Sequence, residues 1–305
     1  MDYILLIIGF LFLIKGADIF VDGSSNVAKI FKVPSVIIGL TIVAMGTSAP
    51  EASVSISAGL MGNNDIAIAN VIGSNIFNLL GVVGLCALLM PFNTDKSILK
   101  RDLPINIIIS IILVVMFIDS KLSFFDGLLL VLMMVVYIIS MIKEAKNHRA
   151  EEENVEVMSL SKSIIFILIG LALVIFGGNV VVKSASNIAY SLGLSENLVG
   201  LTIVAIGTSL PELVTSLVAV YKKETGLALG NAVGSNIFNI LFILGASSMI
   251  SPLTVNPLST IDAGFMIFVG IIMYIFAKTK TNFSKTEGLI SVLLYIAYTA
   301  YLIIR

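Results

Sequence analysis

The sequence has few of the residues that mark a soluble, disulfide-linked or metal-dependent protein. Only 12% of its 305 residues are charged, whereas about a quarter are charged in an average soluble domain. The single cysteine, Cys86, excludes an intrachain disulfide. The single histidine, His148, leaves few ligands for zinc or copper. A phosphate-binding loop of the G-x-x-x-x-G-K type is also missing, which favours an ion gradient over ATP as the energy source.

Apolar residues dominate the composition instead. Hydrophobic residues make up 58% of the chain and the mean hydropathy is +1.07, so most of the surface cannot face water. A membrane-spanning helix needs about 20 mostly apolar residues. The fourth predicted span is short, so we expect it either to recruit residues before Pro104 or to lie where the protein is thin. We predict an all-α polytopic membrane protein with ten transmembrane helices, over residues 3–28, 36–60, 66–90, 103–118, 124–142, 163–188, 196–220, 227–250, 260–277 and 286–304.

The chain repeats itself after 161 residues. At this shift GLTIVAMGTSAPE (39–51) aligns with GLTIVAIGTSLPE (200–212) at 11 of 13 positions. The segment GSNIFN (73–78) aligns with an identical GSNIFN (234–239) at all six positions. The two segments keep one spacing in both copies, which indicates an internal duplication.

The one clearly polar linker, 143–162, divides the chain into a first repeat, 1–142, and a second repeat, 163–305. Each repeat holds five of the predicted spans. Because five is odd, the second repeat must enter the membrane from the opposite side. We therefore predict an inverted-topology repeat (5+5), an arrangement typical of secondary transporters with a site near the membrane midplane.

The basic residues predict the orientation. Loops after odd-numbered spans carry 14 lysines and arginines, and the other side, termini included, carries 3. The positive-inside rule places the basic loops in the cytoplasm. We predict a multi-pass protein of the cell membrane whose N- and C-termini are extracellular.

Two acidic residues interrupt the apolar runs. Glu51 and Glu212 each lie near the middle of a predicted span, where a carboxylate costs about 2.5–3.5 kcal/mol on insertion scales. No basic residue lies near either motif, and Lys15, the lysine expected at depth, has Asp18 at i+3 as its expected partner. The missing positive charge is predicted to be a bound cation. The alternative is a structural role in which hydrogen bonds within the bundle satisfy both carboxylates.

The neighbours of the glutamates are rich in oxygen. Pro50 and Pro211 have no N–H, so the carbonyls of Gly46 and Gly207 lose their helical partner and nearby carbonyls can turn toward a site. A flexible, all-oxygen site suits Ca²⁺ and Na⁺ and needs no cofactor. The candidate ligands besides the glutamates are the carbonyls of Ala44 and Ala205 and the side chains of Thr47, Ser48, Thr208, Ser209, Ser74, Ser235, Asn78 and Asn239.

These polar residues also have structural interpretations. The threonine and serine hydroxyls of the two motifs can bond back to their own helices, and the serines and last asparagines of the GSNIFN segments can serve helix packing. The first asparagines of those segments, Asn75 and Asn236, are interpreted as helix caps at a break. Asp102 and Asp262 are interpreted as solvated ends of spans.

The paired GTSAPE…GSNIFN and GTSLPE…GSNIFN motifs closely resemble the alpha repeats of the sodium/calcium exchanger family, within the calcium/cation antiporter superfamily. The resemblance covers the whole chain and implies that Glu51 and Glu212 ligate both Ca²⁺ and Na⁺. It also implies that spans 1 and 6, which contain Gly16 and Gly177–Gly178, slide against the other helices. The remaining implied ligands are Thr47, Ser48, Thr208, Ser209 and the carbonyls of Ala44 and Ala205 for the calcium and outer sodium sites, Ser74 and Ser235 for flanking sodium sites, and Asn78 and Asn239 for a central one.

Three features distinguish the chain within that superfamily. Asn239 stands where potassium-dependent relatives carry aspartate, which argues against K⁺ co-transport. The linker 143–162 is too short for the calcium-sensing domains of animal exchangers. Proton-coupled calcium exchangers usually carry a first motif of the G-N-x-x-E type, which this chain lacks.

We therefore predict a secondary active antiporter, not an enzyme, that exchanges Na⁺ for Ca²⁺ across the cell membrane by alternating access, independent of K⁺. The alternatives are an H⁺/Ca²⁺ antiporter that uses the same glutamates, a cation channel or uniporter, and an intramembrane enzyme. We expect the chain to work as a monomer in the lipid bilayer. Ca²⁺ and Na⁺ are its expected substrates, with no cofactor and no nucleic-acid partner.

Overall fold

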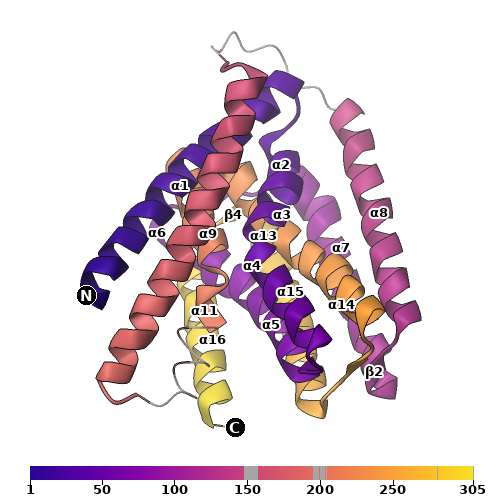
Figure 1. Ribbon diagram of the computed structural model, residues 1–305. Helices are drawn as coiled ribbons and strands as arrows, with labels where there is room; N and C mark the ends of the chain where they lie inside the picture. The colour runs from indigo at the N-terminus through magenta and orange to yellow at the C-terminus, as the bar shows by residue number, and fades with distance from the viewer. Residues whose placement is uncertain (148–156, 195–198, 200–202, 204, 280, 305) are drawn as a thin grey trace.

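The fold is a bundle of helices with two short strand pairs (Figure 1). This agrees with the predicted class of helical membrane protein. The computed structural model describes residues 1–147, 157–194, 199, 203, 205–279 and 281–304. The described elements of the first half are α1 (Asp2–Phe31), α2 (Ser35–Ile38), η1 (Gly39–Val43), α3 (Ala44–Thr47), α4 (Ala49–Leu60), α5 (Asn64–Phe77), η2 (Asn78–Val83), α6 (Gly84–Leu89), β1 (Phe92–Asn93), η3 (Ile98–Asp102), α7 (Leu103–Met116), η4 (Phe117–Asp119), β2 (Lys121–Leu122) and α8 (Phe124–Asn147).

The second half repeats much of this order of elements. Four helical segments and both strands begin and end 161 residues after their counterparts: α12 after α4, α13 after α5, η6 after η2, α14 after α6, β3 after β1 and β4 after β2. The described elements are α9 (Leu160–Ser191), α11 (Ala205–Gly207), α12 (Leu210–Tyr221), α13 (Thr225–Phe238), η6 (Asn239–Leu244), α14 (Gly245–Ile250), β3 (Leu253–Thr254), α15 (Pro257–Lys278), β4 (Asn282–Phe283) and α16 (Lys285–Ile304).

The membrane spans agree with the predicted ranges where they can be compared. In the described part of the chain, 8 helices are long and apolar enough to cross a membrane, and a bent pair, Ser35–Thr47 and Ala49–Leu60, raises this to 9. The fourth span begins at Ile98, ahead of Pro104 as predicted, and has 22 residues. The predicted span 196–220 includes residues outside the described ones, so the count of ten stays a prediction, as do the repeat boundaries.

Helices α1 and α9 cross closely along one side of the bundle and run antiparallel (Figure 1). A Cβ atom added to Gly16 would lie 2.8 Å from the backbone nitrogen of Val174, and one added to Gly23 would lie 2.9 Å from that of Ile167. Gly177 approaches α1 in the same way, with 2.6 Å to a backbone nitrogen. Real Cβ atoms cannot approach a backbone this closely, so the glycines permit the contact.

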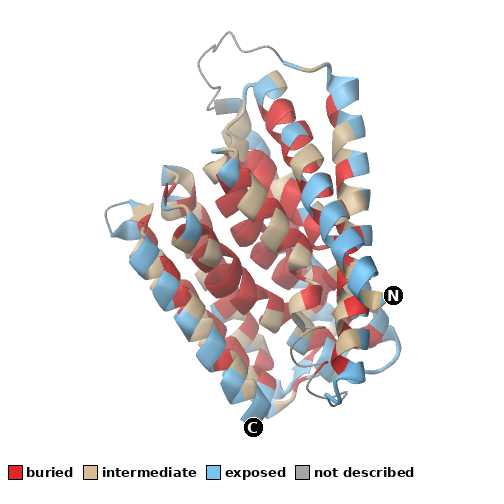
Figure 2. Ribbon diagram, turned by 90° about the vertical axis from the view of Figure 1, so that its left-hand side faces the viewer, coloured by how far each residue is buried: buried red, intermediate tan, exposed pale blue. Residues whose placement is uncertain are grey.

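The core lies around two central helical segments (Figure 2). Residues Asn64–Leu89 and Thr225–Ile250 have 83% and 94% of their most apolar windows buried, whereas the other long spans have 39% or less. The outer helices turn large apolar side chains outward, as a surface in contact with lipid requires. Both strand pairs join the two halves, since β1 pairs with β4 and β2 pairs with β3 in antiparallel register. The central segments carry both GSNIFN sequences.

Candidate functional site

Both glutamates lie in the first turn of a helix that follows a break. In the first half, α3 ends before Ser48, whose φ of −80° and ψ of 8° are not helical, and the chain bends by 49° into α4. Pro50 fits the first turn of α4 because a helix leaves those N–H groups unpaired. In the second half, Ser209 (φ −93°, ψ 9°) precedes α12 with its proline in the same place. A helix N-terminus favours a carboxylate in its first turn.

Each glutamate is bound by hydroxyl groups from both halves. Glu51 and Glu212 are fully buried. Ser209 donates to Glu51 Oε1 at 2.9 Å, and Ser48 donates to Glu212 Oε1 at 2.9 Å. Longer contacts of 3.4 Å join Ser74 to Glu51 Oε1 and the corresponding serine of the second GSNIFN segment, Ser235, to Glu212 Oε1. Each motif therefore completes the environment of the carboxylate in the opposite half.

Four buried oxygens at this level of the bundle have no hydrogen-bond partner. They are Oε2 of Glu51, Oε2 of Glu212, Oδ1 of Asn78 and Oδ1 of Asn239. Asn78 lies one helical turn after Ser74 and therefore shares its face, toward Glu51. Buried acceptors without donors are costly unless a donor or a cation meets them. The arrangement is therefore suited to a cation.

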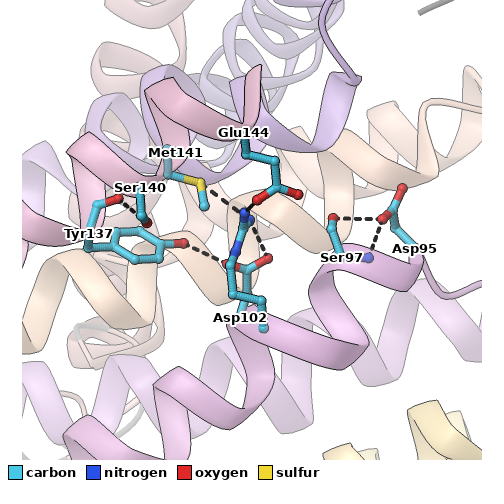
Figure 3. Close-up of polar contacts among 8 residues, drawn as sticks. Asp95, Ser97, Asp102, Tyr137, Ser140, Met141 and Glu144 are labelled. Carbon is cyan, nitrogen blue, oxygen red and sulfur yellow. Dashed lines mark hydrogen bonds and ion pairs between the residues drawn. The ribbon is translucent and has the colours of Figure 1, made fainter. Parts of the chain in front are cut away.

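A third buried carboxylate, Asp102, shows how this protein neutralises charge elsewhere (Figure 3). Asp102 receives hydrogen bonds from Arg101 Nε at 2.8 Å and Nη2 at 2.9 Å, and Tyr137 Oη donates to it at 3.1 Å. Arg101 also forms an ion pair with Glu144. Among the described residues, no lysine or arginine forms such a pair with Glu51 or Glu212. Asp102 thus has a basic partner among the described residues, whereas the two glutamates have none.

The structure corrects the sequence interpretation of three aspartates. Asp102 is fully buried and Asp262 is 7% exposed, so neither is a solvated end of a span. The predicted pairing of Asp18 with Lys15 is also wrong, because Asp18 pairs with Lys222 at 2.7 Å. These partners are distant in sequence, and the tertiary contact decides the pairing in place of the i+3 spacing.

The two threonines of the motifs have different surroundings. Thr47 is fully buried and donates to Asn231 Oδ1 at 2.9 Å, with the carbonyl of Val43 at 3.1 Å. Thr208 is partly exposed and lines a crevice. The carbonyl of Ala44 accepts a hydrogen bond from the Ser48 N–H at 3.1 Å. Ala205 begins α11, a segment of three residues. The site is therefore not symmetric at this level.

Two asparagines that match at the 161-residue shift, Asn70 and Asn231, contact the backbone at the glutamates. Asn70 Nδ2 donates to the carbonyl of Glu51 at 3.3 Å and to Ser55 Oγ at 2.9 Å. Asn231 Nδ2 donates to the carbonyl of Glu212 at 3.3 Å, by the same geometry. Each asparagine thus adds a hydrogen bond to a carbonyl in the first turn of the glutamate's helix. Their match at the 161-residue shift was the signal that could have identified them.

Asn75 and Asn236 are not helix caps. Helix α5 continues through Asn75, and α13 through Asn236, each into a π-helical turn (η2 and η6) without a break. Both side chains are fully buried and bond across the two halves. The sequence interpretation was wrong because the helix widens at this point instead of ending.

A crevice of about 360 Å³ lies beside the two motifs. Pro50, Thr208 and Pro211 line it from the motifs, and Gly178 and Asn179 line it from α9. The glutamate side chains themselves are fully buried, so the crevice reaches the motif prolines and not the carboxylates.

On another face of α12, side chains pack into an apolar cluster with α1 and α9. The apolar cluster consists of Leu13, Ala17, Val174 and Val181, with Leu6, Leu210, Val214 and Val218 packed on it.

Two buried carboxylates that no basic side chain of the described residues neutralises, in a polytopic helical bundle, are typical of ion transporters. The family model described as sodium/calcium exchanger protein matches residues 1–143 and 162–304. The chain therefore belongs to the sodium/calcium exchanger family, a family of membrane antiporters. This confirms the resemblance found in the motifs.

Individual relatives agree over nearly the whole chain. The inner membrane protein YrbG of Escherichia coli is 36% identical over 281 residues, which cover 88% of this chain and 86% of that protein. The sodium/calcium exchanger MaX1 of Methanosarcina acetivorans is 31% identical over 345 residues, which cover 99% and 98%. A solved structure of the sodium-calcium exchanger NCX_Mj, soaked with zero Na⁺ and Ca²⁺, matches with a TM-score of 0.87 at 32% identity and covers 99% and 98% of the two chains.

Proposed function

We propose that this protein exchanges Na⁺ for Ca²⁺ across the cell membrane by alternating access, independent of K⁺, with Glu51 and Glu212 as the shared ligands. The observation that carries the proposal is the pair of fully buried carboxylates, each hydroxyl-bonded through one oxygen with the other unpartnered. Two carboxylates are balanced by one Ca²⁺ or by about two Na⁺, both of which prefer oxygen ligands. Ca²⁺ and Na⁺ compete for the same oxygens, so one kind of ion leaves as the other arrives.

The other ligands follow from the same geometry. The serines that bond the glutamates, Ser48, Ser209, Ser74 and Ser235, stand where a bound ion would share their oxygens. Asn78 and Asn239 add neutral amide oxygens at the centre, and a neutral Asn239 supports independence from K⁺. The less directly supported ligands are Thr47, Thr208 and the carbonyls of Ala44 and Ala205.

Access to the site differs between its two sides, which supports alternating access over a continuous channel. The crevice reaches the motifs from the side where α9 ends, and the apolar cluster closes α12 against α1. We assign the linker 143–162 to the cytoplasm by its basic residues, and with it the termini to the outside. The crevice then opens toward the extracellular side.

The test uses purified protein in liposomes loaded with Na⁺ and diluted into Na⁺-free buffer with radioactive calcium. Wild-type uptake should require the outward Na⁺ gradient, survive a proton uncoupler and stay unchanged when K⁺ is added. Glu51→Gln keeps the shape and removes the charge, so it should reduce uptake to background. The matched control is Glu287→Gln, because Glu287 bonds Ser284 at the start of α16, outside the site.

The alternatives give different results in the same assay. Uptake that follows an imposed pH gradient instead of the Na⁺ gradient would establish an H⁺/Ca²⁺ antiporter. Uptake that needs no counter-ion would establish a channel or uniporter. The proposal fails if wild-type vesicles take up no calcium under any gradient.

A further inference from the structure

Two reciprocal hydrogen bonds join the halves at the centre of the bundle. Asn75 Nδ2 donates to the backbone carbonyl of Asn236 at 3.1 Å, and Asn236 Nδ2 donates to the carbonyl of Asn75 at 3.0 Å. Both residues are fully buried and occupy the same place in the two GSNIFN segments. Each lies one helical turn before a π-helical turn, where the helical hydrogen-bond pattern changes. Their carbonyls thus serve both the helix and the contact between halves.

The same two asparagines also accept hydrogen bonds from the candidate central ligands. Asn239 Nδ2 donates to Asn75 Oδ1 at 3.0 Å, and Asn78 Nδ2 donates to Asn236 Oδ1 at 3.1 Å. The four asparagines are linked in the order Asn239, Asn75, Asn236, Asn78, and we call this set the asparagine ring after the closed pair of bonds at its centre. Its contacts cross between the halves, since Asn75 of the first holds Asn239 of the second, and Asn236 holds Asn78.

The asparagine ring fixes which end of each ligand amide can face an ion. An asparagine amide has a donor end and an acceptor end of nearly the same shape. With the nitrogens of Asn78 and Asn239 engaged in the ring, their Oδ1 atoms are left buried and unpartnered. An amide released from the ring could turn its nitrogen toward a cation, which would repel it.

We propose that Asn75 and Asn236 are positioning residues that hold the amide oxygens of Asn239 and Asn78 toward the transported cation. The inference rests on the proposed function, because it needs a cation at these oxygens. Asparagine is required at both positions. Aspartate could not donate to the opposite carbonyl, and leucine could neither donate nor accept. A substitution at either position changes the orientation of a ligand amide. It therefore affects ion binding through one specific partner in the opposite half.

Double-mutant cycles test this crossed dependence. Purified protein in detergent is titrated with Ca²⁺ and with Na⁺ by calorimetry for Asn75→Ala, Asn239→Ala, Asn78→Ala and the doubles. Loss of a partner that orients a metal ligand weakens ion affinity by about 10-fold or more. Asn75→Ala should therefore raise the half-saturating concentration of at least one ion by about tenfold in the wild-type background. In the Asn239→Ala background it should add less than about twofold, because its target is gone.

The cycle of Asn75→Ala with Asn78→Ala is the internal comparison, since these residues do not bond each other in the ring. Their effects should multiply within about twofold. Asn106→Ala controls for the loss of a buried asparagine, because Asn106 is 2% exposed and lies in α7. Asn75→Leu can neither donate nor accept, and it replaces Asn75→Ala where the alanine variant does not fold.

The outcomes separate the two proposals. Equal coupling of Asn75 to Asn78 and to Asn239, or unchanged affinity in the Asn75 variant that folds (Asn75→Ala or Asn75→Leu), overturns the positioning role while exchange by the wild type stands. Crossed coupling in a wild type that binds Ca²⁺ but shows no Na⁺-dependent uptake supports the positioning role and overturns exchange. A wild type that binds neither ion overturns both.

Discussion

The end of α12 is tied to α1 by ion pairs of Lys222. Lys222 Nζ lies 2.7 Å from Asp18 Oδ1 and 2.6 Å from Asp22 Oδ1, and Ser25 of α1 donates to Glu224. At the 161-residue shift Lys222 corresponds to Met61. We predict that Lys222→Met, which copies the residue of the other repeat, favours the state that opens toward the linker.

The apolar cluster beneath these ion pairs is the barrier that would have to separate. Three of its residues correspond, at the 161-residue shift, to residues that line the crevice on the other side. The same positions are thus packed in one half and open in the other, as alternating access requires. The pairs are Ala17 with Gly178, Leu210 with Ala49, and Val214 with Ser53.

The size of the effect follows from the exposure of the ion pairs. The side chains are 22% exposed for Lys222, 41% for Asp18 and 48% for Asp22, and exposed pairs contribute about 0.2–1 kcal/mol each. Lys222 also donates to the Asp18 carbonyl at 2.9 Å. The contacts together contribute about 1–2 kcal/mol. Since about 1.4 kcal/mol is a factor of ten, their loss shifts the equilibrium roughly 5- to 30-fold.

The assay measures access to the apolar cluster from the linker side. Cys86→Ala provides a background without thiols, and Val214→Cys introduces one label site in inside-out vesicles. Lys222→Met should speed labelling by a membrane-impermeant maleimide by roughly 3- to 15-fold, because labelling follows the open population, which rises from about 3–17% to about one half if the two states are otherwise equal. Lys223→Met is the control, since no described ion pair joins Lys223 to α1. Unchanged labelling, or equal acceleration by the control, would refute the reasoning.

Three further changes have expected outcomes. Ser48→Ala removes the 2.9 Å hydrogen bond to Glu212. Because hydrogen bonds to charged groups contribute about 1.5–3 kcal/mol, the half-saturating Ca²⁺ concentration in the uptake assay should rise roughly tenfold or more. An unchanged concentration would contradict this prediction. Gly16→Ala should destabilise the protein by about 1–3 kcal/mol through overpacking, seen as a lower melting midpoint, whereas Gly264→Ala, with nothing within 4 Å, should not. Asp102→Asn breaks a buried ion pair at a cost of about 3–5 kcal/mol, so the midpoint should fall while Ca²⁺ half-saturation stays unchanged.

The sequence predicted those features that depend on local pattern. Apolar run length located the nine spans that can be compared to within a few residues, because a helix must be long enough to cross the membrane. The proline-glutamate pairs located the helix breaks, because proline cannot donate a helical hydrogen bond. The repeat then placed equivalent residues of the two halves together, and the structure brings Ser48 to Glu212 and Ser209 to Glu51.

The features that were missed depend on partners far apart in the chain. Asn75 bonds Asn236 at a separation of 161 residues, and no local pattern distinguishes this from a helix cap. Asp18 pairs with Lys222 at a separation of 204 residues, while the nearer Lys15 suggested a local pair. Burial of Asp102 also depends on the packing of α8, which composition does not give.

The placement of strong and weak ion pairs fits a protein that must visit two states. Arg101 and Asp102, with exposures of 20% and 0%, are joined to α8 within the first half. Breaking such a pair costs about 3–5 kcal/mol, more than 100-fold in population. The same pair between α1 and α12 would trap one state and stop exchange. The partly exposed contacts of Lys222 shift the balance by roughly 5- to 30-fold, which leaves about 3–17% of the molecules in the other state if the two are otherwise equal. A bias of this size sets a resting conformation and still allows turnover.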